Sequence, residues 1–473
     1  MKKFLTVLFT LALALVLVGC NKKSNAKVIS VWVGEESTEF YQKEAKAFLE
    51  ANPDLDYTIN VIGANTGTAG GAMTADNTAC GDIVTAAHDN IGKMLEKGVI
   101  LPFTNKDLIA QVQNDNPESY QNVIFYNAKN ASGATERNLY GVPYISQALF
   151  LFYNKSKVSA QQATTFEGLI TAAKAAGSTT KAFTITGTDG FNYSFNLLAQ
   201  RASDGYTSLK LFENAKSKNS YVQGDDEVAS LAWAHRVFND ANGGLMPNDS
   251  GWASNLTSGA CLSVIGGAWH FQAAKAALGD NLGIIKLPTY TLTADDVAGT
   301  SVAEGTVMQA GTFADCKAFC INANVAATYP EKIETIEKLI MYFSSKEVQL
   351  RSYLEASNVP AYKTAVDDIE ARKAEIDPIV YDLAVAQIQM AQYGIPQPFV
   401  TGTLNTKYYS LQAPDYYKDA IIGKFVNSDK STDWIPTTST GGTAREALYV
   451  MEYIWKKAEA PKSIPATLPT DID

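Results

Sequence analysis

The chain has 473 residues, of which 46% are hydrophobic and 19% are charged, and its formal net charge is −10. This length predicts two or more lobes, because it is about three times that of a typical domain. The basic residues are scattered, which excludes nucleic acid as a partner, since its binding needs Lys and Arg clustered against phosphate. Beyond the first 20 residues no run of about 18 apolar residues occurs, so we expect the rest of the chain to form a soluble globular body.

The first 20 residues have the pattern of a bacterial lipoprotein signal. Lys2–Lys3 precede the apolar stretch Phe4–Val18 and then Cys20, and an apolar core of about 15 residues is short for a membrane span. We predict that residues 1–19 are a signal peptide, that Cys20 is acylated, and that residues 20–27 form the lipid anchor and tether. The alternative is an ordinary secretory signal with an incidental cysteine. Several acyl chains on one cysteine are enough to hold a protein at a membrane.

Strand and helix patterns alternate after residue 27. Val28–Val33 is β-rich, and Ser37 is a good N-cap for a helix that Asn52–Pro53 ends. A second strand is expected over residues 57–62 and a third over residues 82–87. This rhythm predicts α/β lobes with mainly parallel sheets, in which ligands bind beyond the carboxyl ends of the strands.

Acidic residues follow two of these predicted strands. Glu35 and Glu36 come after the first strand, and Asp89 comes after the third. A carboxylate can accept hydrogen bonds from two adjacent hydroxyls, as a sugar offers them, and such charge-assisted bonds are strong. The structural alternatives are a helix N-cap for Asp89 and a favourable charge near a helix N-terminus for the two glutamates.

A tryptophan follows a later buried-type strand. Trp269 comes after residues 261–265 and the turn Gly266–Ala268, which would aim its ring into a crevice at that end of the sheet. Aromatic faces cover the C–H faces of a pyranose, although a tryptophan in this place can also be a core residue. Further aromatic candidates, most of them expected to be ordinary packing or surface residues, are Tyr144, Tyr193, Tyr408, Tyr409, Tyr416, Tyr417 and Trp434.

The sequence carries no constellation for catalysis. No metal-ligand spacing of Cys and His, nucleophile pattern or phosphate-binding glycine motif is present, so we expect no enzyme, no metal and no cofactor. Cys316 and Cys320 stand four apart in a strand-like stretch, roughly 13 Å when extended, which is too far for a bridge. Two interpretations stay open for the cysteines after Cys20: buried free thiols, or a disulfide that involves Cys80 or Cys261.

Several ordered segments resemble the extracellular solute-binding proteins of ABC importers, in particular the maltose and maltodextrin-binding branch. These segments are Val31–Glu36, Gly81–Val84 with Ala87–Asp89, Gly141–Pro143 with Ala148–Lys155, Thr165–Leu169, Gly266–Trp269 and Leu287–Pro288. Each segment is weak by itself, and their order and spacing over nearly the whole chain carry the resemblance.

The resemblance implies a two-lobed, hinged fold of the type II periplasmic-binding-protein class. One lobe would comprise residues 28–146 plus 287–344 and the other residues 147–286 plus 345–473, with crossings near Gln147, Ile285 and Ser344. A ligand would bind in the cleft, the lobes would close by hinge bending, and the closed form would dock on a membrane permease. The protein would be a monomer, anchored by lipid at the extracellular face of the bacterial cell membrane.

The family's binding residues can be carried over only where its motifs match. Glu35 stands where such proteins place an acidic hydroxyl acceptor, Asp89 matches the acid of the Ala-His-Asp motif, and Trp269 matches a stacking tryptophan. The pair Tyr416–Tyr417 resembles a late aromatic pair that stacks on the sugar, and Tyr408–Tyr409 competes for that role. Tyr193 and Glu36 complete the predicted ligand-binding set.

Four positions depart from the maltose-binding pattern. Ala86 replaces a tryptophan, Asn90 an arginine, Glu36 a basic residue and Gln147 an acidic one. Because an unpaired buried polar group costs about 1–3 kcal/mol, we do not expect tight maltose binding through the same contacts. The predicted function is capture of a carbohydrate, an oligosaccharide or related sugar, for an ABC importer. Its alternatives are a polyamine, a phosphorylated polyol or another non-sugar solute, or a role in surface adhesion.

Overall fold

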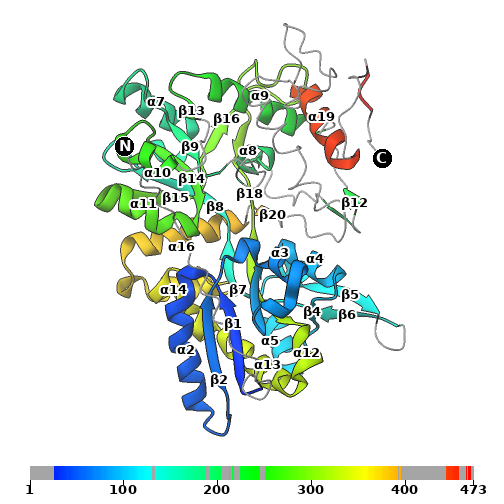
Figure 1. Cartoon of the computed structure of the whole chain (residues 1–473). Helices are drawn as coiled ribbons and strands as arrows, with labels where there is room; N and C mark the ends of the chain where they lie inside the picture. Colours follow the sequence, from blue (N-terminus) through cyan, green and yellow to red (C-terminus); the bar gives the residue numbers. More distant parts are fainter. Residues whose placement is uncertain are drawn as a thin grey trace, which may run out of the picture.

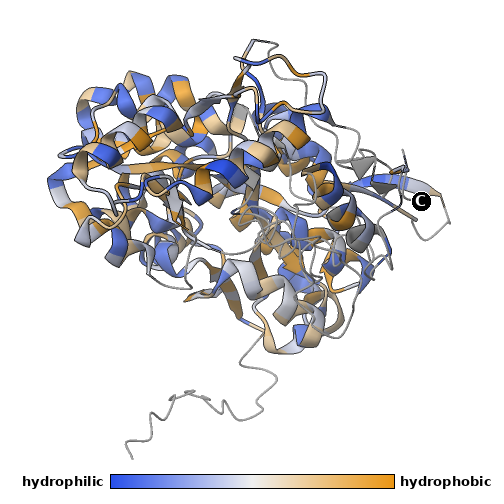
Figure 2. Ribbon diagram, turned by 90° about the horizontal axis from the view of Figure 1, so that it is seen from above, coloured by the Kyte–Doolittle hydropathy of each residue, from blue (hydrophilic) through white to orange (hydrophobic). Residues whose placement is uncertain are grey.

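A computed structural model shows two lobes that lie one above the other (Figure 1). It describes residues 26–129, 134–187, 192, 194–203, 212–213, 216–217, 224–245, 251–392, 394–395, 444–457, 465 and 467–469. Seen from above, hydrophobic residues lie mostly on the strands and inner helix faces, and hydrophilic residues cover much of the outer surface (Figure 2). None of the helices in the described ranges combines the length and the apolar character that a membrane span requires.

The first lobe is built on a six-stranded sheet with strand order β2-β1-β3-β19-β4, in which β7 also pairs with β19. Its strands are β1 (Val28–Val33), β2 (Thr58–Gly63), β3 (Ile83–Ala87), β4 (Ile100–Leu101), β7 (Val142–Gln147) and β19 (Asp315–Asn322). The hairpin of β5 (Phe125–Lys129) and β6 (Thr135–Leu139) extends from this lobe (Figure 1). Its helices are α2 (Thr38–Ala51), α3 (Thr66–Asp76), α4 (Ile91–Glu96), α5 (Lys106–Asp115), α6 (Glu118–Ile124), α12 (Asn324–Thr328), α13 (Ile333–Phe343) and α14 (Lys346–Ala356).

The second lobe is built on a five-stranded sheet with strand order β13-β9-β14-β8-β15. These strands are β8 (Leu149–Asn154), β9 (Phe183–Ile185), β13 (Gly244–Leu245), β14 (Ser263–Gly267) and β15 (Leu282–Ile285). Smaller sheets join β10 (Gln200–Arg201), β17 (Val307–Gln309) and β16 (Thr289–Thr291), then β18 (Thr312–Phe313) and β20 (Gly394–Ile395), and β11 (Phe212–Glu213) and β12 (Lys216–Ser217).

The remaining helices cover the second lobe and the junction between the lobes. They are α7 (Phe166–Ala176), α8 (Ser194–Leu197), α9 (Asp225–Asn239), α10 (Trp252–Ser258), α11 (Phe271–Leu278), α15 (Ala365–Ala371), α16 (Pro378–Gln392) and α19 (Ala444–Lys457). Short 3-10 helices are η1 (Glu35–Ser37), η2 (Asn77–Ala79), η3 (His88–Asn90), η4 (Gln162–Thr164), η5 (Ala268–His270), η6 (Gly279–Asn281), η7 (Pro330–Lys332) and η8 (Lys373–Glu375).

The sheets are mixed, which corrects the expectation of mainly parallel sheets. Strand β1 runs parallel to β2 and β3, whereas β19 runs antiparallel to β3, β4 and β7. In the second lobe β14 runs parallel to β9, whereas β8 runs antiparallel to β14 and β15. The reason is chain direction: β8 and β19 enter their lobes from the other lobe, so they begin at the junction where β1, β3 and β14 end.

The buried cores show where the chain crosses between lobes. Ile145 belongs to the core of the first lobe and Ala148 to that of the second, so the first crossing lies between them. The second crossing lies between Phe313 and Cys316, not near Ile285 as expected, because the intervening segment from Leu287 packs in the second-lobe core. The first-lobe core continues through Val348 on α14, so the third crossing lies beyond the expected Ser344.

The four cysteines after Cys20 are free thiols. Cys261, Cys316 and Cys320 are buried, and Cys80 is partly buried. The structure therefore agrees with the interpretation as buried thiols and contradicts the alternative of a disulfide through Cys80 or Cys261.

Candidate functional site

Four predicted candidates lie in three copies of one local structure, a strand followed by a one-turn 3-10 helix. Glu35 and Glu36 lie in η1 after β1, Asp89 lies in η3 after β3, and Trp269 lies in η5 after β14. In each case the turn leads straight into an α-helix. The strands β1 and β3 are parallel neighbours in the first lobe, whereas β14 belongs to the second. The turns therefore bring acidic groups from one lobe and an indole from the other to the junction.

Two glycines make these turns possible. The carboxylate of Glu36 folds back over Gly34, where an added Cβ would lie 2.5 Å from Oε1. The indole of Trp269 folds back over Gly267 in the same way, with its ring carbons 2.2 Å from the position of an added Cβ. Any larger residue at either place would displace the side chain that follows.

Two of these turns, η1 and η5, border a cavity of about 300 Å³ between the lobes. The residues that line it are Glu35, Glu36, Ala64, Asn65, Thr66, Gly67, Ala87, Gln147, Trp269 and Lys317. A smaller cavity of about 60 Å³ shares Glu36, Gln147, Trp269 and Lys317, and it extends to residues 356–359. Two of the three predicted acidic positions and the predicted tryptophan thus line one cleft.

The floor of the cleft is formed by the segments that cross between lobes. Gln147 at the end of β7 pairs with Asp315 at the start of β19, and the backbone N–H of Ser146 donates to the carbonyl of Val359 at 2.9 Å. Ser357, in the same connection, lines the smaller cavity and has a positive φ of 58°. A ligand in the cleft would therefore touch the hinge region itself.

An ion pair lies at the cleft floor. The ammonium of Lys317 contacts Oε1 of Glu36 at 2.9 Å, and the lysine side chain is only 8% exposed. Burial tends to raise the pKa of the Glu36 carboxyl, but the charge and the hydrogen bond of Lys317 outweigh burial and hold the pKa below its usual value. The Glu36 side chain remains 43% exposed toward the cleft, so an ionised acceptor is available there.

The second-lobe wall is aromatic. Trp269 is 40% exposed, which is high for so large an apolar side chain. Its neighbour His270 makes an edge contact with Trp252 at 5.3 Å between ring centroids. Burial lowers the pKa of His270 to about 4, so this imidazole is neutral at pH 7. The exposed indole is the apolar surface that the second lobe offers to a ligand.

Asp89 has a different environment. It lies two residues beyond Ala87, which lines the larger cavity, but Asp89 itself lines neither of the two cavities. Burial raises the pKa of its carboxyl to about 6, partly offset by the charge of Lys93. Asn90, and not Asp89, occupies the N-cap position of α4. A role of Asp89 in ligand binding stays a prediction.

The comparisons with known proteins agree with this architecture. A profile of the bacterial extracellular solute-binding protein family matches residues 43–378, more than half of the chain. The chain belongs to this family. This solute-binding protein is similar to a maltooligosaccharide ABC transporter solute-binding lipoprotein of Streptococcus pneumoniae (strain ATCC BAA-255 / R6). The two are 24% identical over 402 residues, and the match covers 79% of this chain and 84% of that protein.

Two further comparisons bear on this solute-binding protein. It is 23% identical to the galactooligosaccharide-binding protein of Bacillus subtilis (strain 168), and the match covers 62% of this chain and 63% of that protein. Its fold resembles that of the maltodextrin-binding protein of L. casei BL23 without ligand, with a TM-score of 0.66 and 21% identity over 91% of this chain and 98% of that one. The predicted resemblance and the two-lobed α/β fold are confirmed.

The remaining predicted residues lie either outside the described part of the chain or in a core. Tyr193, Tyr416, Tyr417 and Cys20 lie outside the described residues, as do Tyr408, Tyr409 and Trp434. Tyr144 is a core residue, because its ring packs against Phe319 at 4.3 Å and Tyr41 at 5.8 Å between centroids.

Lys317 is a cleft residue that the sequence reasoning missed. It lies in β19, where every residue is buried, and a lysine in a buried strand signals a partner or a function. Asn65 and Thr66, at the start of α3, were also missed. They lie within residues 63–71, a glycine-rich stretch that the sequence predicts to be a flexible loop, whereas in the structure α3 begins inside it at Thr66 with Asn65 as its N-cap.

Proposed function

We propose that this solute-binding protein captures a carbohydrate, an oligosaccharide or related sugar, in the cleft between its lobes and delivers it to an ABC permease. The observation that carries the proposal is that an ionised carboxylate, Glu36, and an exposed indole, Trp269, line one cavity from opposite lobes. A carboxylate accepts hydrogen bonds from sugar hydroxyls, and an indole face covers the apolar C–H face of the ring.

The size of the cavity supports a small ligand. Its volume of about 300 Å³ is at the lower end of the range for small-molecule sites, about 300–1,000 Å³. Gln147 and Asn65 add amide groups to the lining, and amides can donate to and accept from hydroxyls. The names of the pneumococcal and Bacillus subtilis relatives, which refer to maltooligosaccharides and galactooligosaccharides, point to the same class of ligand.

A cationic solute such as a polyamine is the second candidate. Glu35 and Glu36 lie side by side at the cavity and face an exposed indole, and carboxylates with an aromatic face can bind an ammonium group. The ion pair with Lys317 disfavours it, because that pair neutralises one of the two carboxylates. A phosphorylated polyol is less favoured still, since the buried ammonium of Lys317 is engaged by Glu36.

The anchor and the partners belong to the same proposal. Acylation of Cys20 would hold the protein at the extracellular face of the membrane, and residues 20–27 would let it move there. As a monomer it would close over the sugar by bending at the three crossings and present the closed form to the permease subunits. This is a transport role without catalysis.

Calorimetric titration of the whole chain, kept in a detergent without a sugar headgroup, tests the proposal. The ligands are maltotetraose, galactotriose, spermidine and glucitol 6-phosphate, each at low and high NaCl. We expect binding of at least one of the neutral sugars with little dependence on salt, because a neutral ligand is not screened. Binding of spermidine alone, weakened by salt, would instead establish the cationic candidate.

A further inference from the structure

Lys317 is a buried cation with one ionic partner among the described residues, and that partner is a cleft residue. Its side chain is 8% exposed, and its ammonium donates to Oε1 of Glu36 at 2.9 Å. Burying an ammonium is unfavourable unless it is paired and hydrogen-bonded. The two residues come from different parts of the first lobe, 281 positions apart in sequence. The fold therefore keeps a cation beneath one particular carboxylate at the cleft.

The contact leaves half of that carboxylate for a ligand. Gly34 supports one side of the Glu36 carboxylate, and Lys317 occupies Oε1. Among the described residues Lys317 is the side chain that donates to this carboxylate, and the Glu36 side chain remains 43% exposed. The carboxylate is thus held at Oε1, and because Glu36 lines the cavity and is partly exposed, it keeps acceptor capacity for a ligand hydroxyl.

The same turn is also tied to the hinge. Ser37, the next residue of η1, accepts a hydrogen bond from the side-chain amide of Asn358 at 3.0 Å. Lys317 lies two residues beyond Asp315, which pairs with Gln147 at the first crossing. The two contacts hold η1 against the second crossing and against the connection that follows α14, so the orientation of Glu36 depends on both.

Other charged and titratable groups surround the pair. Tyr144 on β7 interacts electrostatically with Glu36, and Glu35 lines the same cavity. Asp315 interacts with the charges of Lys317 and Asp89, and His88 Nδ1 lies 3.8 Å from Oδ2 of Asp315. Tyr144 stays neutral in the physiological range, because burial raises its pKa. Burial also raises the pKa of Asp315 well above the usual value, and the nearby Asp89 charge adds to that rise. Lys317 is thus the cation in this set that opposes the desolvation of Glu36.

We propose that Lys317 is a positioning residue of the ligand site: it orients the Glu36 carboxylate and keeps it ionised, so that the site selects ligands that donate hydroxyl hydrogens. The inference rests on the proposed function and deepens it. A ligand carboxylate or phosphate would meet repulsion from Glu36 and would find the lysine already occupied.

The test compares Lys317→Gln with a matched control, Lys332→Gln. Lys332 is also a buried lysine, 2% exposed, and it pairs with Asp82 at 3.3 Å and contacts the ring of Tyr329, away from the residues that line the cleft. Affinity is measured by calorimetry for whichever of maltotetraose and galactotriose binds the wild type, between about pH 7.5 and pH 5. Lys317→Arg, which keeps the charge, serves as the conservative variant.

We expect the wild type and Lys332→Gln to bind equally at each pH. Lys317→Gln is expected to bind about tenfold more weakly at pH 7.5 and to weaken further as the pH falls, because burial then raises the pKa of Glu36 unopposed. Lys317→Arg is expected to recover most of the affinity. Lys317→Gln with unchanged affinity and a flat pH profile would overturn the inference and leave the proposed function standing.

Carbon-13 NMR of the Glu36 carboxyl separates the two proposals. We expect its pKa to lie below the usual glutamate value in the wild type and above it in Lys317→Gln, whatever the ligand is. Equal pKa values in both proteins would overturn the ionising role of Lys317. A wild type that binds neither sugar overturns the proposed function, while a shifted Glu36 pKa in the variant still supports the role of Lys317 toward Glu36.

Discussion

The two walls of the cleft are built in opposite ways. The first-lobe wall presents Glu36, which is held by Lys317 and Gly34 before any ligand arrives. The second-lobe wall presents Trp269, which is 40% exposed and contacts the ring of His270. Hydrogen bonds are directional, so a carboxylate gains from being fixed in advance, whereas an apolar ring needs only contact area. The comparison indicates that the first wall sets which ligand is accepted and that the second wall adds affinity.

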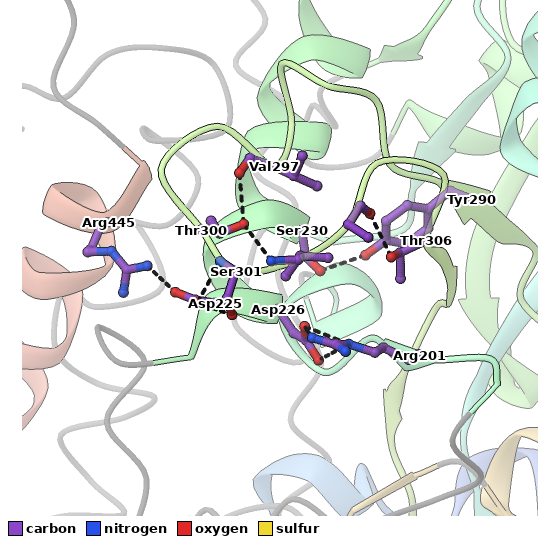
Figure 3. Close-up of polar contacts among 12 residues, drawn as sticks. Arg201, Asp225, Asp226, Ser230, Tyr290, Val297, Thr300, Ser301, Thr306 and Arg445 are labelled. Carbon is purple, nitrogen blue, oxygen red and sulfur yellow. Dashed lines mark hydrogen bonds and ion pairs between the residues drawn. The ribbon is translucent and has the colours of Figure 1, made fainter.

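The second lobe does use ionic groups, but away from the cleft. Asp225 at the start of α9 accepts from the backbone N–H of Ser301 at 2.8 Å and from its hydroxyl at 2.6 Å, and Arg445 on α19 contacts the same carboxylate (Figure 3). Arg201 and Asp226 form a second pair beside it, at 2.7 Å. These contacts join α9, the segment before β17 and α19, so here charge serves the assembly of the lobe.

The largest effect is expected for Trp269→Ala. Loss of the indole removes the apolar surface that a sugar ring would cover, and we expect affinity to fall by about 2 kcal/mol, roughly thirtyfold in Kd. The fall should be similar for every sugar that binds and should not depend on pH, because this wall carries no ionised group. Calorimetry of Trp269→Ala and Trp269→Phe measures both features.

Intrinsic fluorescence provides the control for that variant. Trp252 contacts His270 but does not line either cavity, so Trp252→Phe is expected to keep the ligand-induced fluorescence change that Trp269→Ala loses. A ligand-induced change that survives in Trp269→Ala would remove Trp269 from the site and with it the contrast between the two walls.

Asp89 tests whether the first wall extends beyond Glu36. Burial raises the pKa of its carboxyl to about 6, so the folded protein holds this proton more tightly than the unfolded chain does. Its charge therefore destabilises the fold at pH 7, and that penalty disappears as the pH falls through about 6 toward about 4. We expect Asp89→Asn to raise the free energy of unfolding by about 1–2 kcal/mol at pH 7 and to have no effect near pH 4.

Urea unfolding at the two pH values measures this difference, and calorimetry measures the sugar affinity of the same variant. A gain in stability together with weaker binding would show that the carboxylate is retained for the ligand. Lower stability at pH 7 would show instead that its hydrogen bonds outweigh the cost of its burial.

Much of the site could be predicted from local sequence, because a strand followed by a glycine or a short polar turn fixes where the next side chain points. Glu35, Glu36 and Trp269 follow this pattern, and all three line the cleft. The pattern does not extend to Lys317, whose partner is 281 positions away and whose role depends on tertiary structure alone.

The lobe boundaries show a second limit of local reasoning. The resemblance implied a crossing near Ile285, just before Leu287–Pro288, yet Tyr290 and Phe313 are both fully buried in the second-lobe core. Strand and turn patterns indicate that a strand ends, but they do not indicate which core the next segment joins. For the same reason the directions of β8 and β19 could not be predicted from the alternation of elements.

A smaller effect is expected at the hinge. Ser357 ends α14 with φ 58° and ψ 25°, a left-handed conformation that is unfavourable for residues with a Cβ. Glycine adopts it freely but gains freedom in the unfolded chain, so we expect Ser357→Gly to stabilise the fold by about 0.5 kcal/mol. Thermal unfolding measures this, with Glu355→Gly inside α14 as the control, expected to destabilise by about 1 kcal/mol. If Ser357→Gly is the less stable variant, contacts of the serine side chain outweigh the backbone strain.

The smallest effect is expected at Asp225, whose contacts join α9 to α19 in the second lobe. The pKa of the Asp225 carboxyl is lowered to about 2, first by hydrogen bonds from Ser301 and then by the contact with Arg445, while burial opposes part of this shift. Its contribution to stability is therefore present above the unfolded pKa of about 4 and is lost as the pH falls toward 2, and solvent screening keeps it to about 0.5 kcal/mol. We expect Asp225→Asn to increase hydrogen exchange in α19 at pH 7 while exchange in α2 and the sugar affinity stay unchanged. Altered sugar affinity would mean that the contacts of Asp225 act on the cleft. Charged groups would then not be divided between assembly of the second lobe and ligand binding in the first.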